Sequence, residues 1–100
     1  EMGLLLGRKF SASKEEFTFN DRYIGPGYAR PYTEALETIK QVAEFGIVLE
    51  PVYTAKAFYG MLQELKSLGC RNPLFIHTGG LFGLFPYRQE LFRKSSGRTA

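Results

Sequence analysis

The sequence predicts an α/β protein with a mostly parallel sheet, and three observations support this prediction. Apolar side chains recur at spacings of three and four residues in two stretches, as they do in helices that bury one face. The continuous apolar run at residues 74–76 is typical of a parallel strand covered on both faces. About two or three strand candidates are present, whereas a typical sheet has about five or six strands. We therefore expect part of the sheet to lie outside these residues, in a missing upstream portion or a partner chain.

The first half of the chain predicts a short strand, a turn and a helix. Residues 17–20 alternate apolar and polar side chains, which favours a half-buried strand. The Gly-Pro-Gly sequence at residues 25–27 predicts an irregular turn that presents Tyr28, because glycine admits positive φ and proline fixes its own φ. The hydroxyl of Thr33 is expected to cap a helix, and Gly46 is placed to end it.

The second half predicts a longer helix, a strand and a last helix. Residues 47–49 are expected to form a short buried connector. Thr54 is expected to cap the longer helix, which ends at Gly69. The apolar face expected for this helix contains Phe58, Met61, Leu62, Leu65 and Leu68. The strand at 74–76 follows, and residues 81–87 begin a last helix that Pro86 interrupts.

Composition and charge exclude several classes of function. The chain of 100 residues has 44% hydrophobic and 23% charged residues, so we expect one segment of a soluble, intracellular domain, cytoplasmic or organellar, with no membrane span. The net charge of +3 is concentrated in residues 88–100, which we expect to be a solvated or disordered tail and not a nucleic-acid arm. Cys70 is the only cysteine and His77 the only histidine, so neither a disulfide, a metal site nor a Ser-His-Asp triad is expected.

Three stretches place hydroxyl residues and glycines at the ends of apolar segments, and we expect them to form the walls of one ligand pocket. They are residues 25–31, 51–60 and 75–80. Ligands of α/β folds bind at the carboxyl ends of strands, where Thr78 and the two glycines after it lie. Each stretch alone also has a purely structural explanation, as a tight turn or as a helix cap beside a core tyrosine.

Taken together, these three stretches resemble in order and spacing the carboxyl-terminal part of the D-cysteine desulfhydrase and 1-aminocyclopropane-1-carboxylate deaminase family. The resemblance covers about residues 17–87, and Leu84, Phe85 and Tyr87 extend it. It implies a segment of the three-layer α/β/α fold of tryptophan-synthase-β-like, fold-type II enzymes. It also implies pyridoxal 5'-phosphate as cofactor, a small amino-acid substrate and a homodimeric parent enzyme.

The resemblance also implies roles for particular residues. Tyr28 and Tyr53 match two active-site tyrosines, which contact the substrate or transfer protons. Thr54, Thr78 and Gly79 match cofactor-binding positions, Thr54 beside the pyridine nitrogen. A hydroxyl there gives a weaker electron sink than the glutamate of the deaminases, which favours β-elimination of D-cysteine to pyruvate, hydrogen sulfide and ammonia.

Departures from the family keep two alternatives open. The lysine that holds the cofactor, a serine and the phosphate loop are expected upstream of these residues, so the chain alone is not expected to be an enzyme. Lys56 does not match that lysine, and helical spacing predicts that it points outward. Ala55 stands where relatives often have glycine, and Ala29 and Arg30 replace a more usual pair. The alternatives are a 1-aminocyclopropane-1-carboxylate deaminase and a non-catalytic segment or interaction module.

Overall fold

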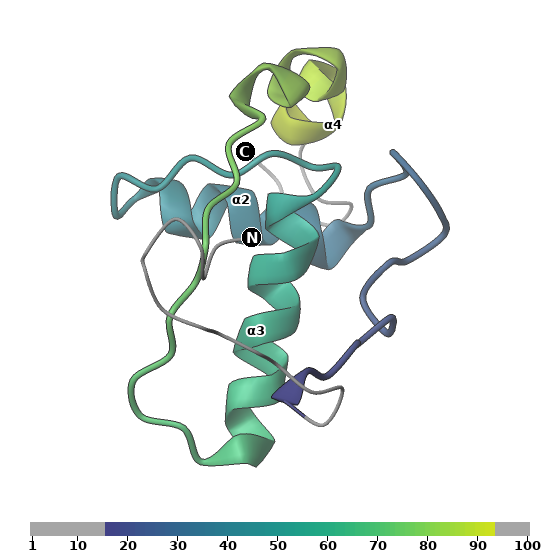
Figure 1. Ribbon diagram of the computed structural model, residues 1–100. Helices are drawn as coiled ribbons and strands as arrows, with labels where there is room; N and C mark the ends of the chain where they lie inside the picture. The colour runs from purple at the N-terminus through teal and green to yellow at the C-terminus, as the bar shows by residue number, and fades with distance from the viewer. Residues whose placement is uncertain (1–15, 94–100) are drawn as a thin grey trace, which may run out of the picture.

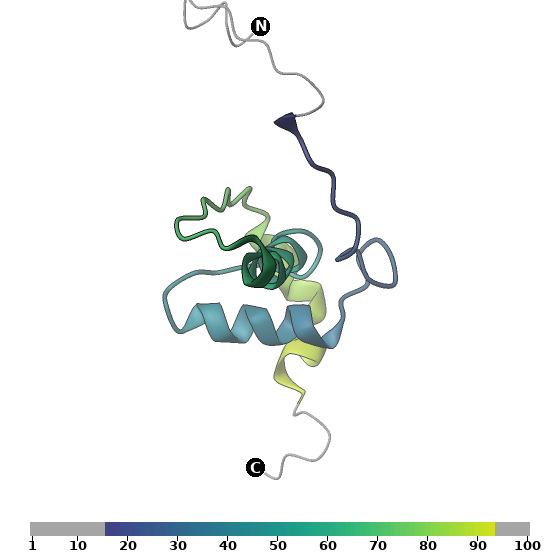
Figure 2. The same cartoon turned by 90° about the horizontal axis from the view of Figure 1, so that it is seen from below.

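The computed structural model describes residues 16–93, which fold around two helices (Figure 1). The elements in chain order are helix α2 (Thr33–Ala43), helix α3 (Thr54–Leu68), the 3-10 helix η2 (Leu81–Tyr87) and helix α4 (Arg88–Phe92). Helix α2 lies across α3, as the two views together show (Figures 1 and 2). After α3 the chain runs back along that helix to η2 and α4, which lie near its N-terminal end (Figure 1).

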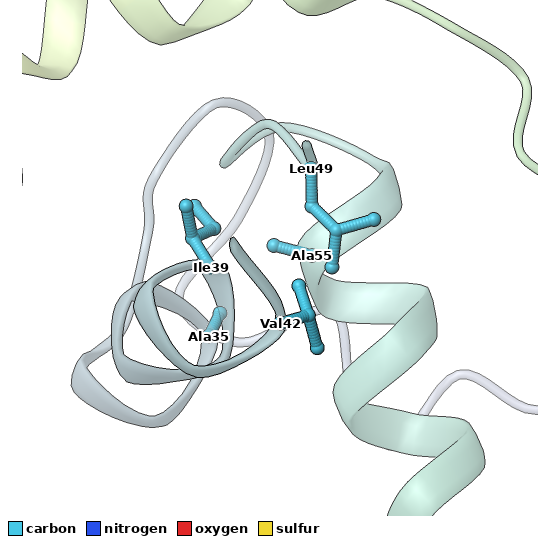
Figure 3. Packing of buried hydrophobic residues seen from close by; sticks show 5 residues of the cluster. All are labelled: Ala35, Ile39, Val42, Leu49 and Ala55. Carbon is cyan, nitrogen blue, oxygen red and sulfur yellow. The ribbon is translucent and has the colours of Figure 1, made fainter. Parts of the chain in front are cut away.

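A small apolar core lies where α2 meets the start of α3 (Figure 3). The five buried hydrophobic residues are Ala35, Ile39, Val42, Leu49 and Ala55. They come from α2, from the connector between the helices and from the first turn of α3, so the connector is partly buried as predicted. Leu49 is fully buried shortly before α3 begins at Thr54, so its packing anchors the segment that leads into this helix.

The ends of the two main helices are partly as predicted. Gly46 and Gly69 adopt left-handed φ values of 81° and 63°, which confirms both as terminators. Beyond Gly46, the Ile47 N–H donates to the Val42 carbonyl at 3.2 Å. The predicted cap by Thr33 is wrong, because the N-cap residue is Tyr32 and no side chain bonds to the first amides of α2.

No strand forms among residues 16–93, so the predicted sheet is not confirmed. The two predicted strand segments, residues 17–20 and 74–76, run without strand partners. Strands covered on both faces need neighbouring strands for their backbone hydrogen bonds. The side chains of Leu74 and Ile76 are accordingly 87% and 74% exposed.

The end of the described range differs from the prediction in two ways. Pro86 lies inside η2 and does not interrupt it. Residues Arg88–Phe92, predicted as the start of a solvated tail, form the short helix α4. The remainder of the predicted tail, from residue 94, lies outside the described residues.

Candidate functional site

The loop of residues 24–30, here called the Tyr28 loop, has an unusual backbone. Gly25, Gly27 and Ala29 adopt positive φ values of 73°, 142° and 56°. The Arg30 N–H donates to the Gly27 carbonyl at 3.2 Å and closes a turn. Only glycine adopts such φ values without strain, so the two glycines set the path that presents Tyr28.

The structure brings Tyr28 together with Tyr53, although they are far apart in the sequence. The Tyr53 hydroxyl donates to the Tyr28 hydroxyl at 3.1 Å, across 25 residues of chain. The ring centroids lie 6.0 Å apart and the ring planes are inclined by 62°, an edge-to-face contact. Both side chains are exposed, so two paired phenols face outward at the start of α3.

An open cavity of about 720 Å³ lies between the segment that ends at Tyr28 and helix α3. Apolar groups line most of it, including Ile24, Val52 and Met61. Tyr28 and Tyr53 line the same cavity, and so does Lys56. Its size falls within the range of small-molecule pockets.

Three tyrosine phenols have pKa values above the ordinary value of 10.0. The hydrogen bond to Tyr28 raises the pKa of Tyr53 most, and partial burial adds to it. Partial burial is the main cause of the raised pKa of Tyr23, and the hydrogen bond to Glu64 comes next. Partial burial also raises the pKa of Tyr32 most, followed by the charge of Tyr59. The Tyr53 phenol is therefore protonated at neutral pH.

The raised pKa values predict how stability depends on pH. A phenol whose pKa is higher in the folded state stabilises the fold below the unfolded-state pKa, and this contribution is lost as the pH rises through the folded-state pKa. We expect the free energy of unfolding to fall as the pH rises above 10.0, the ordinary tyrosine value. The chain has six tyrosines and no tryptophan, so tyrosinate absorbance reports their ionisation directly. A free energy of unfolding that stays constant through this alkaline range would contradict the expectation.

Glu50, which sequence reasoning missed, caps α3 in place of Thr54. Its carboxylate is 1% exposed and accepts the N–H groups of Val52, Tyr53 and Thr54 at 2.7, 2.8 and 2.7 Å. In return the Thr54 hydroxyl accepts the Glu50 N–H at 2.8 Å. The predicted cap by Thr54 is therefore wrong, since α3 has no side-chain bond from its N-cap residue, Tyr53. An acidic residue just before a helix was the available signal.

Lys56 corrects a second prediction, because it points inward and not outward. The residue is 7% exposed, and its Nζ donates to the carbonyls of Ile24 and Gly27 at 2.8 and 3.0 Å. It also lies 5.8 Å from the centre of the Tyr32 ring. Hydrophobic periodicity along α3 could not predict that Lys56 is buried, because its hydrogen-bond acceptors lie in the Tyr28 loop, far away in the sequence.

Thr78 and Gly79 lie apart from the cavity that the tyrosines line, on the return segment after α3. His77 anchors this turn: its Nε2 lies 2.7 Å from the Val48 carbonyl, and its Nδ1 accepts the Gly79 N–H at 3.0 Å. Thr78 is exposed. The turn joins the start of α3 through Gly80, because a Cβ added there would lie 3.5 Å from the Glu50 side chain. The five predicted site residues thus form two groups: Tyr28, Tyr53 and Thr54 near the start of α3, and Thr78 and Gly79 on the later turn. Glu50 lies close to both, because it accepts the Thr54 N–H and lies beside Gly80.

Residues 16–93 contain no group of three or more His, Cys, Asp or Glu side chains that could hold a metal ion. No helix between residues 16 and 93 has the length and apolarity needed to cross a bilayer.

Comparison with known proteins identifies relatives. A Thermotoga maritima protein provisionally named 1-aminocyclopropane-1-carboxylate deaminase is 53% identical over 76 residues, covering 75% of this chain and 24% of the relative. The mitochondrial bifunctional D-cysteine desulfhydrase/1-aminocyclopropane-1-carboxylate deaminase of Arabidopsis thaliana is 42% identical over 88 residues, covering 83% and 22%. The D-cysteine desulfhydrase of Klebsiella pneumoniae is 40% identical over 83 residues, covering 79% and 25%.

No family model and no solved structure matches the chain. The match spans about a quarter of the length of each of these relatives. The motifs at the Tyr28 loop, the start of α3 and the turn after residue 76 had already indicated the same group of proteins, and the comparison confirms it. The chain therefore belongs to the D-cysteine desulfhydrase and 1-aminocyclopropane-1-carboxylate deaminase family, as a carboxyl-terminal segment.

Proposed function

We propose that this chain is the carboxyl-terminal segment of a pyridoxal phosphate-dependent lyase that acts on a small amino acid, with D-cysteine as the first candidate. The observation that carries the proposal is the contact between Tyr28 and Tyr53, which pairs two phenols across 25 residues of chain, both of them lining one cavity. The names of the relatives support D-cysteine desulfuration and cyclopropane opening equally. Thr54 favours the first, because a hydroxyl pairs less strongly with the cofactor nitrogen than a carboxylate does.

The proposed cofactor-binding residues carry suitable hydrogen-bonding groups, but Thr54 is bonded to Glu50 in this segment. The Thr54 hydroxyl accepts the Glu50 N–H at 2.8 Å, and it donates to the Oε1 and the carbonyl oxygen of Glu50, at 3.3 and 3.5 Å. Because Thr54 is 2% exposed and its proton is directed at Glu50, its hydroxyl would have to turn away from Glu50 to donate to a ring nitrogen. Thr78 and Gly79 present a hydroxyl and a glycine backbone at an exposed turn. When bound, pyridoxal phosphate supplies an electron sink for the electron pair left when an amino acid loses its Cα proton.

The two tyrosines supply a proton donor. Tyr53 donates its proton to the Tyr28 oxygen, which leaves the Tyr28 proton free for another acceptor. Because its hydrogen bond to Tyr28 and partial burial raise the pKa of Tyr53, the Tyr53 phenol stays protonated at neutral pH. We assign to Tyr28 the transfer of a proton to the sulfur that leaves Cβ, and to Tyr53 the polarisation of the Tyr28 hydroxyl.

The rest of the parent enzyme would complete the sheet. Leu74 and Ile76 have largely exposed side chains and no strand partner among the described residues. Strands from an upstream portion or a partner chain would cover them and complete an α/β/α sheet. The parent is proposed to be a homodimer.

A segment exchange tests the proposal. The matched part of this chain, 79% of its length, would replace the corresponding segment of the Klebsiella pneumoniae D-cysteine desulfhydrase. Release of sulfide and pyruvate from D-cysteine is expected from the hybrid, and no turnover from the isolated chain. Conversion of 1-aminocyclopropane-1-carboxylate to 2-oxobutyrate without sulfide release would favour the deaminase. A folded hybrid that acts on neither substrate would favour the non-catalytic segment.

Tyrosine substitutions in that hybrid test the proposed roles. Tyr28→Phe removes the donor to the leaving sulfur, so turnover of D-cysteine is expected to fall by about 10²–10⁴-fold. Tyr53→Phe removes only a hydrogen bond to Tyr28, so a fall of roughly tenfold is expected, equivalent to about 1.4 kcal/mol. Tyr59→Phe is the matched control, since that ring only packs against Tyr23 and Tyr32. Equal losses for Tyr28→Phe and Tyr59→Phe would exclude the proposed proton transfer.

A further inference from the structure

We propose that Lys56 is a positioning residue that ties the Tyr28 loop to α3 and thereby sets the Tyr28 hydroxyl against that of Tyr53. The inference rests on the proposed function, which gives the tyrosine pair its role. It concerns a lysine that does not match the position of the cofactor-binding lysine.

The first argument is the placement of the ammonium group. Lys56 lies on the first turn of α3, close after Tyr53 in the sequence. Its Nζ reaches across to the carbonyls of Ile24 and Gly27, at 2.8 and 3.0 Å. One side chain therefore binds two points of the loop, on the N-terminal side of Tyr28, from the helix that begins beside Tyr53.

The second argument is burial. Lys56 is 7% exposed, and a buried ammonium is costly unless its protons are hydrogen-bonded. Two carbonyl acceptors and the face of Tyr32 at 5.8 Å compensate part of this cost. If the loop moved away, the ammonium would lose both acceptors, so the lysine favours the one loop position that keeps them.

A third argument is that the other end of the loop has its own tie. The Tyr87 hydroxyl donates to the Ala29 carbonyl at 2.6 Å, after Tyr28 in the chain. Loss of the lysine contacts would then release the first half of the loop and leave the second half attached. Tyr28 lies between the two ties, so its hydroxyl is expected to shift while the chain stays folded.

Titration of Tyr53 in the full 100-residue chain tests the inference without any enzyme activity. The Tyr53 ionisation is followed by NMR of the tyrosine Cζ, assigned by the Tyr53→Phe variant. Lys56→Met keeps most of the side-chain volume and removes the donors, so Tyr53 is expected to ionise at lower pH, as in Tyr28→Phe. Lys56→Arg, which can still donate to both carbonyls, is expected to keep the parent titration. Lys66→Met is the matched control, because that lysine bonds only to Gln63 on the same helix, at 3.3 Å.

The outcomes separate this inference from the proposed function. Parent-like titration of Tyr53 in Lys56→Met would overturn the inference and leave the lyase proposal standing. If Lys56→Met loses its helical circular dichroism, the Lys56→Arg variant is the test. A Tyr53 ionisation at the same pH as in the parent chain would support the tie. A shift to lower pH with intact helices would overturn it. In the active hybrid, Lys56→Met is expected to lower kcat by roughly tenfold with little change in KM, since misplaced groups lose rate and not binding.

Discussion

Replacing Glu50 with alanine is expected to lower the free energy of unfolding by about 3 kcal/mol. The carboxylate is buried and accepts three backbone N–H groups at the start of α3, within 2.8 Å each. Alanine leaves the Thr54 N–H without its acceptor in a buried place and the other two N–H groups in a partly buried one. Hydrogen bonds to a charged acceptor are stronger than those between neutral groups. A urea titration of the 100-residue chain, followed by circular dichroism, measures the loss.

Two further variants interpret that result. Glu37→Ala removes a half-exposed carboxylate that pairs with Lys40 at 3.5 Å on α2, so a loss below about 0.5 kcal/mol is expected. Glu50→Gln keeps one acceptor oxygen, so its loss in the free energy of unfolding is expected to lie between those of Glu50→Ala and Glu37→Ala. If Glu50→Ala costs no more than Glu37→Ala, the carboxylate does not hold the start of α3.

Replacing Gly25 with alanine is expected to lower the free energy of unfolding by about 2–4 kcal/mol, since two costs add. The φ of 73° is a left-handed conformation that disfavours any Cβ, at about 1–2 kcal/mol. A Cβ there would also lie 2.7 Å from Cε1 of the Tyr32 ring, closer than carbon atoms approach. Relief of that clash would shift the loop that carries Tyr28, so the Tyr53 titration is expected to move to lower pH as well.

Gly69→Ala separates the two costs. Gly69 has a similar φ of 63°, but nothing lies within 4 Å of a Cβ built on it. Only the backbone cost of about 1 kcal/mol is expected there, partly offset because alanine restricts the unfolded chain. Equal losses at the two glycines would show that Tyr32 yields freely, and the proposed shift of the Tyr28 loop would then be wrong.

The sequence predicted the two main helices well because their signals are local. Apolar periodicity places α2 and α3, and glycine ends each of them through its own left-handed φ. The caps could not be assigned this way. Both threonines are suitable caps by type, yet α3 takes its cap from Glu50, which lies four residues before Thr54 and reaches the amides by folding back.

The sequence by itself determined where the helices lie and, through three linked motifs, the family of the chain and its candidate tyrosines, threonines and glycine. Only the tertiary structure decided which of these residues meet: it paired Tyr28 with Tyr53 and left Thr78 and Gly79 on a separate turn. It also buried Lys56, whose acceptors lie 32 and 29 residues away in the chain. Periodicity predicts burial from the hydrophobicity of one segment, whereas a charge can be buried only where distant segments supply its partners.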